Sequence, residues 1–299
     1  MKFPKEITRT LRQFGYFDPK KIDDAILILE KFNKKVMILA GGTDLLNQMK
    51  VRQVKPEFIL NIKNIKELDY LKNNGGLEIG PLTTITAIRE SEVVKESYRS
   101  LYDAAEWFGT PQIRNMATVG GNICRSSPSS DMVAPLMALD AKLKLVGPKG
   151  GRKVPIEEFA LATGENALER EILTEIIVPK QEELFGTAFI KLKRSSADLA
   201  KVSCAVGIVL KGGKCEDIRI VLGAVADKVF RAKKAEELLR GEKVTEAMIV
   251  EAGNKASHEA RPVTDVRSTA QYREQMIGVL VQRMIRLSIE RTKVLSSAI

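Results

Sequence analysis

Two glycine-rich segments have a composition that suits the binding of phosphate groups. The first, AGGTDL at 40–45, directly follows a short apolar run at 36–39. The second, TVGGN at 118–122, lies inside the stretch 109–140, which continues through a Ser/Pro-rich turn to Asp131. Glycine lets the backbone approach a bulky ligand, and successive N–H groups in a turn form a concave anion site. Two such segments suit a ligand that carries a diphosphate.

Two familiar nucleotide-binding motifs are absent from the sequence. There is no G-x-G-x-x-G pattern of a Rossmann domain and no G-x-x-x-x-G-K-[ST] pattern of a P-loop. The string KGGK at 211–214 lacks the spacing and the following hydroxyl of a P-loop, so it predicts only a turn. One Gly-Gly pair alone is weak evidence for a ligand, but two pairs with similar flanks are a stronger signal.

The composition is that of a globular protein, because 44% of the 299 residues are hydrophobic and 29% are charged. No run approaches the ~20 apolar residues of a membrane span. No apolar signal core follows the basic N-terminus. We therefore expect a cytoplasmic protein without a membrane span.

The formal net charge of +10 raises the question of a nucleic-acid partner. The cations are spread along the chain, only 5% of the residues are aromatic, and no stacking or groove-reading motif is present. We expect a solvated, lysine-rich surface and no nucleic-acid binding. Docking against an acidic partner subunit stays open as an alternative.

Cysteine and histidine usage argues against a metal centre in this chain. Cys124, Cys204 and Cys215 show no CxxC spacing and are too few for a four-cysteine cluster. His258 is the only histidine, so we expect no histidine-rich zinc site. The sequence predicts reduced thiols and no metal site.

Hydrophobic periodicity places the glycine segments between helices and strands. Around the first segment we expect a helix at 21–34, strands at 36–40 and 57–62, and a domain boundary near Pro56. The middle region begins with a hairpin whose turn is 73–76. The elements expected after it are helices at 84–93, 97–108 and 132–139 and strands at 141–146 and 172–178.

The pattern changes after Pro179, so we place a second boundary there. The strands predicted beyond it lie at 187–193, 204–210 and 218–225. The helices that follow are expected at 232–240, 245–257 and 269–296.

The string IRNMATVGGNI at 113–123, followed by SPSSD and an apolar helix, resembles the flavin-binding subunit of the molybdenum hydroxylases. This family includes xanthine dehydrogenase, aerobic carbon monoxide dehydrogenase and related aldehyde oxidoreductases. AGGTDLL resembles the family's first pyrophosphate loop. The strings ILTEIIVP, FIKLKRSSADLAKV and VLGAVADKVFRAKKAEELLRG follow in the family's order, so the resemblance covers nearly the whole chain.

The resemblance implies an α+β protein with the FAD-binding fold of the vanillyl-alcohol-oxidase (PCMH) class. Two FAD-binding subdomains are then expected, at 1–56 and 57–180. A C-terminal domain at 181–299 would hold a three-stranded antiparallel sheet with helices. The implied cofactor is FAD, extended between the two subdomains.

The resemblance also implies which residues bind FAD. The first diphosphate loop would consist of Ala40, Gly41, Gly42, Thr43 and Asp44. The second would consist of Thr118, Gly120, Gly121 and Asn122.

Three further cofactor contacts follow from the same resemblance. Asp131 would accept a hydrogen bond from a sugar or ribityl hydroxyl, although a role as a helix N-cap is also open. Leu173 would make a backbone contact near the adenine or flavin edge. Lys191 would approach the isoalloxazine ring, with Lys193 as a rival for this role.

The implied function is that of an FAD-carrying electron-transfer subunit with no catalytic residue of its own. Its partners would be a molybdopterin-containing large subunit and a small subunit with [2Fe-2S] clusters, assembled as a dimer of heterotrimers. One alternative is a stand-alone flavin reductase of the same fold class, such as the enolpyruvyl-UDP-sugar reductase. Another is a non-catalytic scaffold that has lost its flavin.

Overall fold

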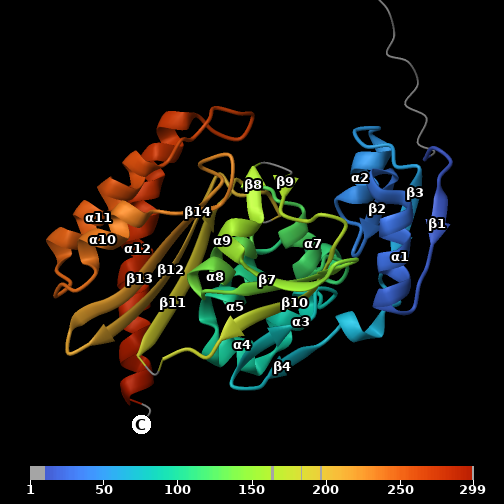
Figure 1. Ribbon diagram of the computed structural model, residues 1–299. Helices are drawn as coiled ribbons and strands as arrows, with labels where there is room; N and C mark the ends of the chain where they lie inside the picture. Colours follow the sequence, from blue (N-terminus) through green and yellow to red (C-terminus); the bar gives the residue numbers. More distant parts are fainter. Residues whose placement is uncertain (1–10, 163–164, 183, 196, 298–299) are drawn as a thin grey trace, which may run out of the picture.

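The computed structural model describes residues 11–162, 165–182, 184–195 and 197–297, which form three units, each built on a sheet (Figure 1). The N-terminal unit is a parallel sheet of order β1-β3-β2 with two α-helices. Its elements are β1 (Gly15–Phe17), α1 (Ile22–Phe32), the 3-10 turn Asn33–Lys35, β2 (Val36–Leu39), α2 (Leu45–Lys50) and β3 (Phe58–Asn61).

The first sheet extends beyond the boundary that the sequence predicted near Pro56. Strand β3 pairs in parallel with both β1 and β2, so it belongs to the N-terminal unit. Pro56 precedes this strand and does not end the unit. The N-terminal sheet therefore ends at Asn61.

The middle unit contains an antiparallel sheet of order β4-β5-β10-β6-β7. Its strands are β4 (Leu71–Asn73), β5 (Gly76–Ile79), β6 (Lys142–Gly147), β7 (Gly150–Pro155) and β10 (Ile172–Pro179), with the small pair β8 (Ala160–Ala162) and β9 (Glu165–Asn166) beside them. The predicted hairpin is confirmed, since β4 and β5 pair on either side of a tight turn, up to the pair Asn73 and Leu77.

Short helices make up the rest of the middle unit. They are the 3-10 turn Lys66–Leu68, α3 (Ile85–Glu90), α4 (Glu92–Ser97), α5 (Arg99–Trp107), α6 (Pro111–Arg114), α7 (Val119–Cys124), α8 (Val133–Ala138) and α9 (Ile156–Phe159). The single helix predicted at 84–93 is wrong in one respect, because Ser91 divides it. The Ser91 side chain accepts a hydrogen bond from the Val94 N–H and so caps α4.

The C-terminal unit has a four-stranded sheet, one strand more than predicted. Its elements are β11 (Phe185–Leu192), β12 (Val202–Lys211), β13 (Lys214–Gly223), β14 (Phe230–Arg231), α10 (Lys233–Leu239), α11 (Glu246–Glu259) and α12 (Ala270–Ser297). The three long strands and the KGGK turn are confirmed. β14 has only two residues and therefore no alternating pattern that a sequence can reveal.

Apolar packing joins the C-terminal sheet to helices on both of its faces. Helix α12 packs against β11 and β12, whereas α5 contacts β11 and α8 contacts β12 from the middle unit (Figure 1). Phe185 and Phe189 lie in one buried cluster with Leu136 and Met137 of α8. The middle and C-terminal units thus share a core. No helix among the described residues is both long and apolar enough to cross a bilayer.

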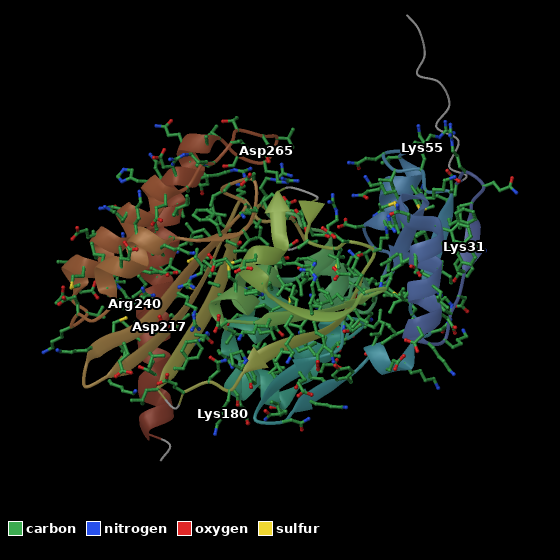
Figure 2. The ribbon with its side chains drawn as sticks, viewed as in Figure 1. Lys31, Lys55, Lys180, Asp217, Arg240 and Asp265 are labelled. Carbon is green, nitrogen blue, oxygen red and sulfur yellow. The ribbon has the colours of Figure 1, made fainter. Side chains whose placement is uncertain are left out.

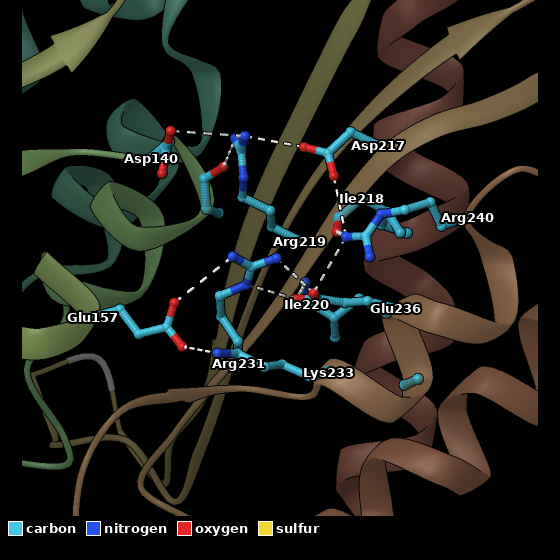
Figure 3. Close-up of polar contacts among 12 residues, drawn as sticks. Asp140, Glu157, Asp217, Ile218, Arg219, Ile220, Arg231, Lys233, Glu236 and Arg240 are labelled. Atoms are coloured by element: carbon cyan, nitrogen blue, oxygen red, sulfur yellow. Dashed lines mark hydrogen bonds and ion pairs between the residues drawn. The ribbon is translucent and has the colours of Figure 1, made fainter. Parts of the chain in front are cut away.

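A network of ion pairs also connects these two units (Figure 3). The Glu236 carboxylate is buried and accepts hydrogen bonds from Nε of Arg231 at 2.9 Å and Nη2 at 2.6 Å. It also accepts from the Ile220 N–H at 2.9 Å. Arg231 and Lys233 in turn pair with Glu157 of the middle unit, at 3.7 and 2.6 Å. Asp217 and Arg240, at the edge of this network, are labelled in Figure 2.

Glu236→Gln is expected to lower the free energy of unfolding by about 3 kcal/mol, because it leaves the largely buried Arg231 without its bidentate partner. Denaturant unfolding of the full chain measures the change. Glu237→Gln alters an exposed neighbour and should stay within ~0.5 kcal/mol of wild type. Equal midpoints for the two variants would contradict the assigned role of Glu236.

Candidate functional site

The two glycine segments lie against each other, although they are far apart in the sequence. A Cβ at residue 41 would overlap the carbonyl oxygen of Met116, just before the second segment. A Cβ at Gly121 would lie 3.9 Å from the Cβ of Ala40. The expectation that the two segments are neighbours is therefore confirmed.

The first segment presents backbone donors that the protein does not use. Within the described part of the chain, no group accepts a hydrogen bond from the N–H groups of residues 41–45. Gly42 has a φ of +75°, which glycine adopts without strain, and its carbonyl accepts from the Leu46 N–H at 3.1 Å. The chain therefore turns into α2 with its N–H groups unpaired, as an anion site requires.

The second segment differs from the open turn that the sequence suggested, because it begins helix α7. Thr118 caps this helix by accepting from the Gly121 N–H at 3.1 Å. The Gly120 N–H donates to the carbonyl of Pro81 at 2.9 Å. The two glycine amides are thus already paired, and a Cβ at Gly120 would lie 2.7 Å from that same carbonyl oxygen. Here glycine is required for close packing.

Side chains supply the free donors of the second segment. The hydroxyl of Thr118 accepts from Gly121 but donates to no described group. The Oδ1 of Asn122 accepts from the Met132 N–H at 3.0 Å, whereas its Nδ2 has no acceptor among the described residues. The roles of these residues at the diphosphate stay predictions.

An ion pair connects the two segments at their edge. Nε of Arg125, directly after α7, lies 3.3 Å from Oδ2 of Asp44 in the first segment. The sequence does not reveal this carboxylate partner of Arg125. No local pattern could have shown the pair, because 80 residues that fold into other elements separate its members.

Asp131 and Lys191 form a buried ion pair beside these segments. Nζ of Lys191 donates to Oδ2 of Asp131 at 2.6 Å, and the two side chains are 1% and 6% exposed. Burial raises the pKa of the Asp131 carboxyl, and the charges of Lys191 and Lys193 oppose that rise. Lys191 is thus held by a carboxylate in a place where water does not reach it.

The second carboxylate oxygen of Asp131 is left without a partner. Oδ1 is buried and no described group donates to it, which costs about 1–3 kcal/mol unless a ligand donor satisfies it. The proposed N-cap role of Asp131 is wrong, because Met132 occupies the N-cap position of α8 and no side chain caps that helix.

Lys193 and Leu173 complete the set of predicted residues. The Nζ of Lys193 lies 4.6 Å from the centre of the Trp107 ring, and burial and the nearby Lys191 lower the pKa of the Lys193 ammonium. Leu173 is buried in β10, a strand that contacts α7. Because its side chain faces the core, only its backbone is available to a ligand.

Two family models match the chain. The model described as the FAD-binding domain in molybdopterin dehydrogenase matches residues 12–181. The chain belongs to this family. The model of the CO dehydrogenase flavoprotein C-terminal domain matches residues 187–287, the unit that packs on the FAD-binding domain. The protein is therefore an FAD-binding subunit of the molybdenum hydroxylase type, and as such an oxidoreductase subunit.

Curated relatives and solved structures agree with this membership. The glyceraldehyde dehydrogenase medium chain of Sulfolobus acidocaldarius is 33% identical, over 92% of this chain and 98% of that one. The carbon monoxide dehydrogenase medium chain of Hydrogenophaga pseudoflava is 34% identical, over 93% and 98%. A structure of carbon monoxide dehydrogenase from H. pseudoflava, lacking the Mo-pyranopterin moiety of the molybdenum cofactor, matches with a TM-score of 0.92 and 34% identity, covering 94% of this chain and 99% of that one.

The residues of the site fit the FAD that this family binds. A diphosphate needs several hydrogen-bond donors, and the N–H groups of 41–45 have no other partner in the described chain. A sugar or ribityl chain offers hydroxyl donors, and Oδ1 of Asp131 is a buried acceptor that lacks one. In the described chain, no group of three or more His, Cys, Asp or Glu side chains is arranged to hold a metal.

Gly41→Ala is expected to lower FAD content about tenfold, because the new Cβ forces Met116 and the first segment apart. The flavin absorbance per mole of purified chain measures this loss. Gly151→Ala is the matched control, since its Cβ would meet the Leu145 carbonyl at an ordinary 3.7 Å. A Gly41→Ala protein with full flavin content would show that close approach of the segments is unnecessary.

In the Lys191→Met variant, the free energy of unfolding is expected to fall as pH rises. The variant leaves the Asp131 carboxyl buried without its cation, so the folded-state pKa lies well above the unfolded value of ~3.9. Between these two pKa values the folded state binds more protons, and about 3 kcal/mol is lost as pH rises from about 4 to about 7.

The measurement is the unfolding free energy of the apoprotein across that pH range. Lys191→Met combined with Asp131→Asn removes the buried charge, and this double variant should lose the added pH dependence. A single variant whose pH profile parallels that of wild type would argue against the pair.

Proposed function

We propose that this chain is the electron-transfer subunit of a molybdenum hydroxylase complex. It would take electrons from iron–sulfur clusters of a partner chain and pass them, through FAD, to an external acceptor. One observation carries the proposal. The chain matches an FAD-binding domain, and its structure combines the unpaired amides of 41–45 with the buried ion pair of Asp131 and Lys191. This site is built to hold and tune a cofactor.

The relatives support a role that does not depend on the substrate. The two medium chains named above belong to a glyceraldehyde dehydrogenase and a carbon monoxide dehydrogenase, and both align along nearly the full chain. An aldehyde and a diatomic gas have little chemistry in common. A conserved architecture in both enzymes therefore fits a shared electron-transfer step better than substrate selection.

We assign substrate oxidation to a large partner that contains molybdopterin, and electron delivery to a small partner with [2Fe-2S] clusters. The complex is proposed to be a dimer of such heterotrimers. We propose the cytoplasm as its location, because Cys124, Cys204 and Cys215 are all unpaired thiols.

The site residues would act by binding, orienting and tuning. When bound, FAD supplies the reversible uptake and release of electrons. The amides of 41–45 would bind the diphosphate, with the Thr118 hydroxyl and Asn122 Nδ2 as further donors. Oδ1 of Asp131 would accept from a hydroxyl of the cofactor. Lys191, fixed by Oδ2 of the same carboxylate, would hold a positive charge near the flavin ring.

The proposal predicts that FAD is needed for electron release and not for substrate oxidation. A complex assembled with Gly41→Ala should oxidise its substrate with an artificial dye that accepts electrons at a partner chain. Its activity with the natural acceptor should fall about as far as its FAD content. Both rates and the flavin absorbance are measured on the same preparation, with Gly151→Ala as the control.

Two results would overturn the proposal. One is a flavin-depleted complex that keeps full activity with the natural acceptor. The other is a chain that purifies without partners and reduces a substrate on its own, which would favour the stand-alone flavin reductase.

A further inference from the structure

Four large side chains of the C-terminal unit lie on or beside two neighbouring loops, the first at 193–195 and 197–201 and the second at 261–269. Leu199 belongs to the first loop, Val263 and Val266 belong to the second, and Tyr272 lies in the first turn of α12, directly after the second loop. Val266 is 91% exposed and Val263 65%, and Leu199 and Tyr272 are exposed as well. We call these four residues the Val266 face. Large exposed apolar side chains that gather on one surface are typical of a protein contact site.

Two interactions show that the loops are neighbours. Nζ of Lys201 lies 5.5 Å from the centre of the Tyr272 ring. The hydrogen bond from Arg194 lowers the pKa of the Asp198 carboxyl, and the charge of Arg267, across the same gap, adds to this effect. Leu199 therefore lies on the same surface as the residues of the second loop.

Hydrogen bonds hold Val266 at the tip of a fixed turn. The Asp265 carboxylate accepts from the N–H groups of Arg267 at 2.8 Å and Ser268 at 3.2 Å. It also accepts from Nη2 of Arg273 at 2.6 Å. Arg273 is buried and donates to the Ala224 carbonyl at 2.7 Å. A side chain presented in this way loses little conformational freedom on binding, which favours affinity.

Hydrogen bonds connect the loops of the Val266 face to the segment that leads to Asp131. The Ala224 N–H donates to the carbonyl of Pro128, in the turn that leads to Asp131. The Arg261 N–H, at the start of the second loop, donates to the carbonyl of Val225 at 2.9 Å. The first loop continues directly from β11, which carries Lys191. Figure 2 shows Asp265 on the loop above the C-terminal sheet.

Positive charge surrounds these apolar side chains. The cations of the two loops include Arg194, Lys201, Arg261 and Arg267. The carboxylates Asp198 and Asp265 are each already paired with an arginine. The two loops around the face therefore carry a net positive charge, and the complement of such a surface is acidic.

We propose that the Val266 face docks the chain that delivers electrons to this subunit, through an acidic surface with an apolar pocket for Val266. The inference rests on the proposed function, in which the chain that delivers electrons must come close to the cofactor site. The positive charge around the face favours an acidic partner, and Val266, at the tip of the fixed turn, supplies the central apolar contact.

The test uses the complete complex, co-expressed with wild-type chain, Val266→Asp or Val263→Asp. Leu27→Asp is the matched control, because Leu27 is also a large exposed residue, at 61%, but lies on α1 of the N-terminal unit. Co-purification of the electron-delivering chain, the FAD content, and the rate of flavin bleaching after substrate addition are measured. Lys201→Ala, compared with wild type over a salt series, tests the charge.

Val266→Asp is expected to weaken association with the electron-delivering chain about tenfold or more, with unchanged FAD content and slower bleaching. Val263→Asp should act in the same direction, and Leu27→Asp should match wild type. Lys201→Ala should reduce the salt dependence of association.

Normal association of both valine variants, or loss of only the molybdopterin chain, overturns the inference. A wild-type complex that assembles with FAD but shows no bleaching overturns the proposed function instead.

Discussion

The structure depends on the close approach of two backbone segments. Only glycine, which has no side chain, permits this approach. A Cβ at Gly41 would overlap the Met116 carbonyl, so any other residue there separates the N-terminal unit from the start of α7. This contact places the unpaired amides of 41–45 beside the free donors of Thr118 and Asn122. Because the first segment belongs to the N-terminal unit and the second to the middle unit, the diphosphate site is formed only when both units fold and meet.

The buried pair of Asp131 and Lys191 places fixed charge next to that junction. A buried carboxylate with one unsatisfied oxygen is costly in the free chain, and a hydroxyl donor from the cofactor relieves this cost on binding. The pair also explains why the C-terminal unit matters for the site, since Lys191 comes from β11 and Asp131 from the middle unit. The shared core and the Glu157–Arg231 ion pair fix the position of those two units relative to each other.

The sequence predicted the long strands, the main helices and the proximity of the glycine segments, because periodicity and glycine spacing are local signals. It did not predict that Gly120 and Gly121 begin a helix, since their hydrogen bonds depend on Pro81 and on the cap by Thr118. The two-residue strand β14 has too few residues for a pattern. The Arg125–Asp44 pair and the orphan oxygen of Asp131 arise only from tertiary contacts.

A crystal structure of the chain with FAD tests the central claim most directly. The account predicts the diphosphate between residues 40–45 and 118–122, with a cofactor hydroxyl donating to Oδ1 of Asp131. A diphosphate bound elsewhere, with the amides of 41–45 facing solvent, would contradict it.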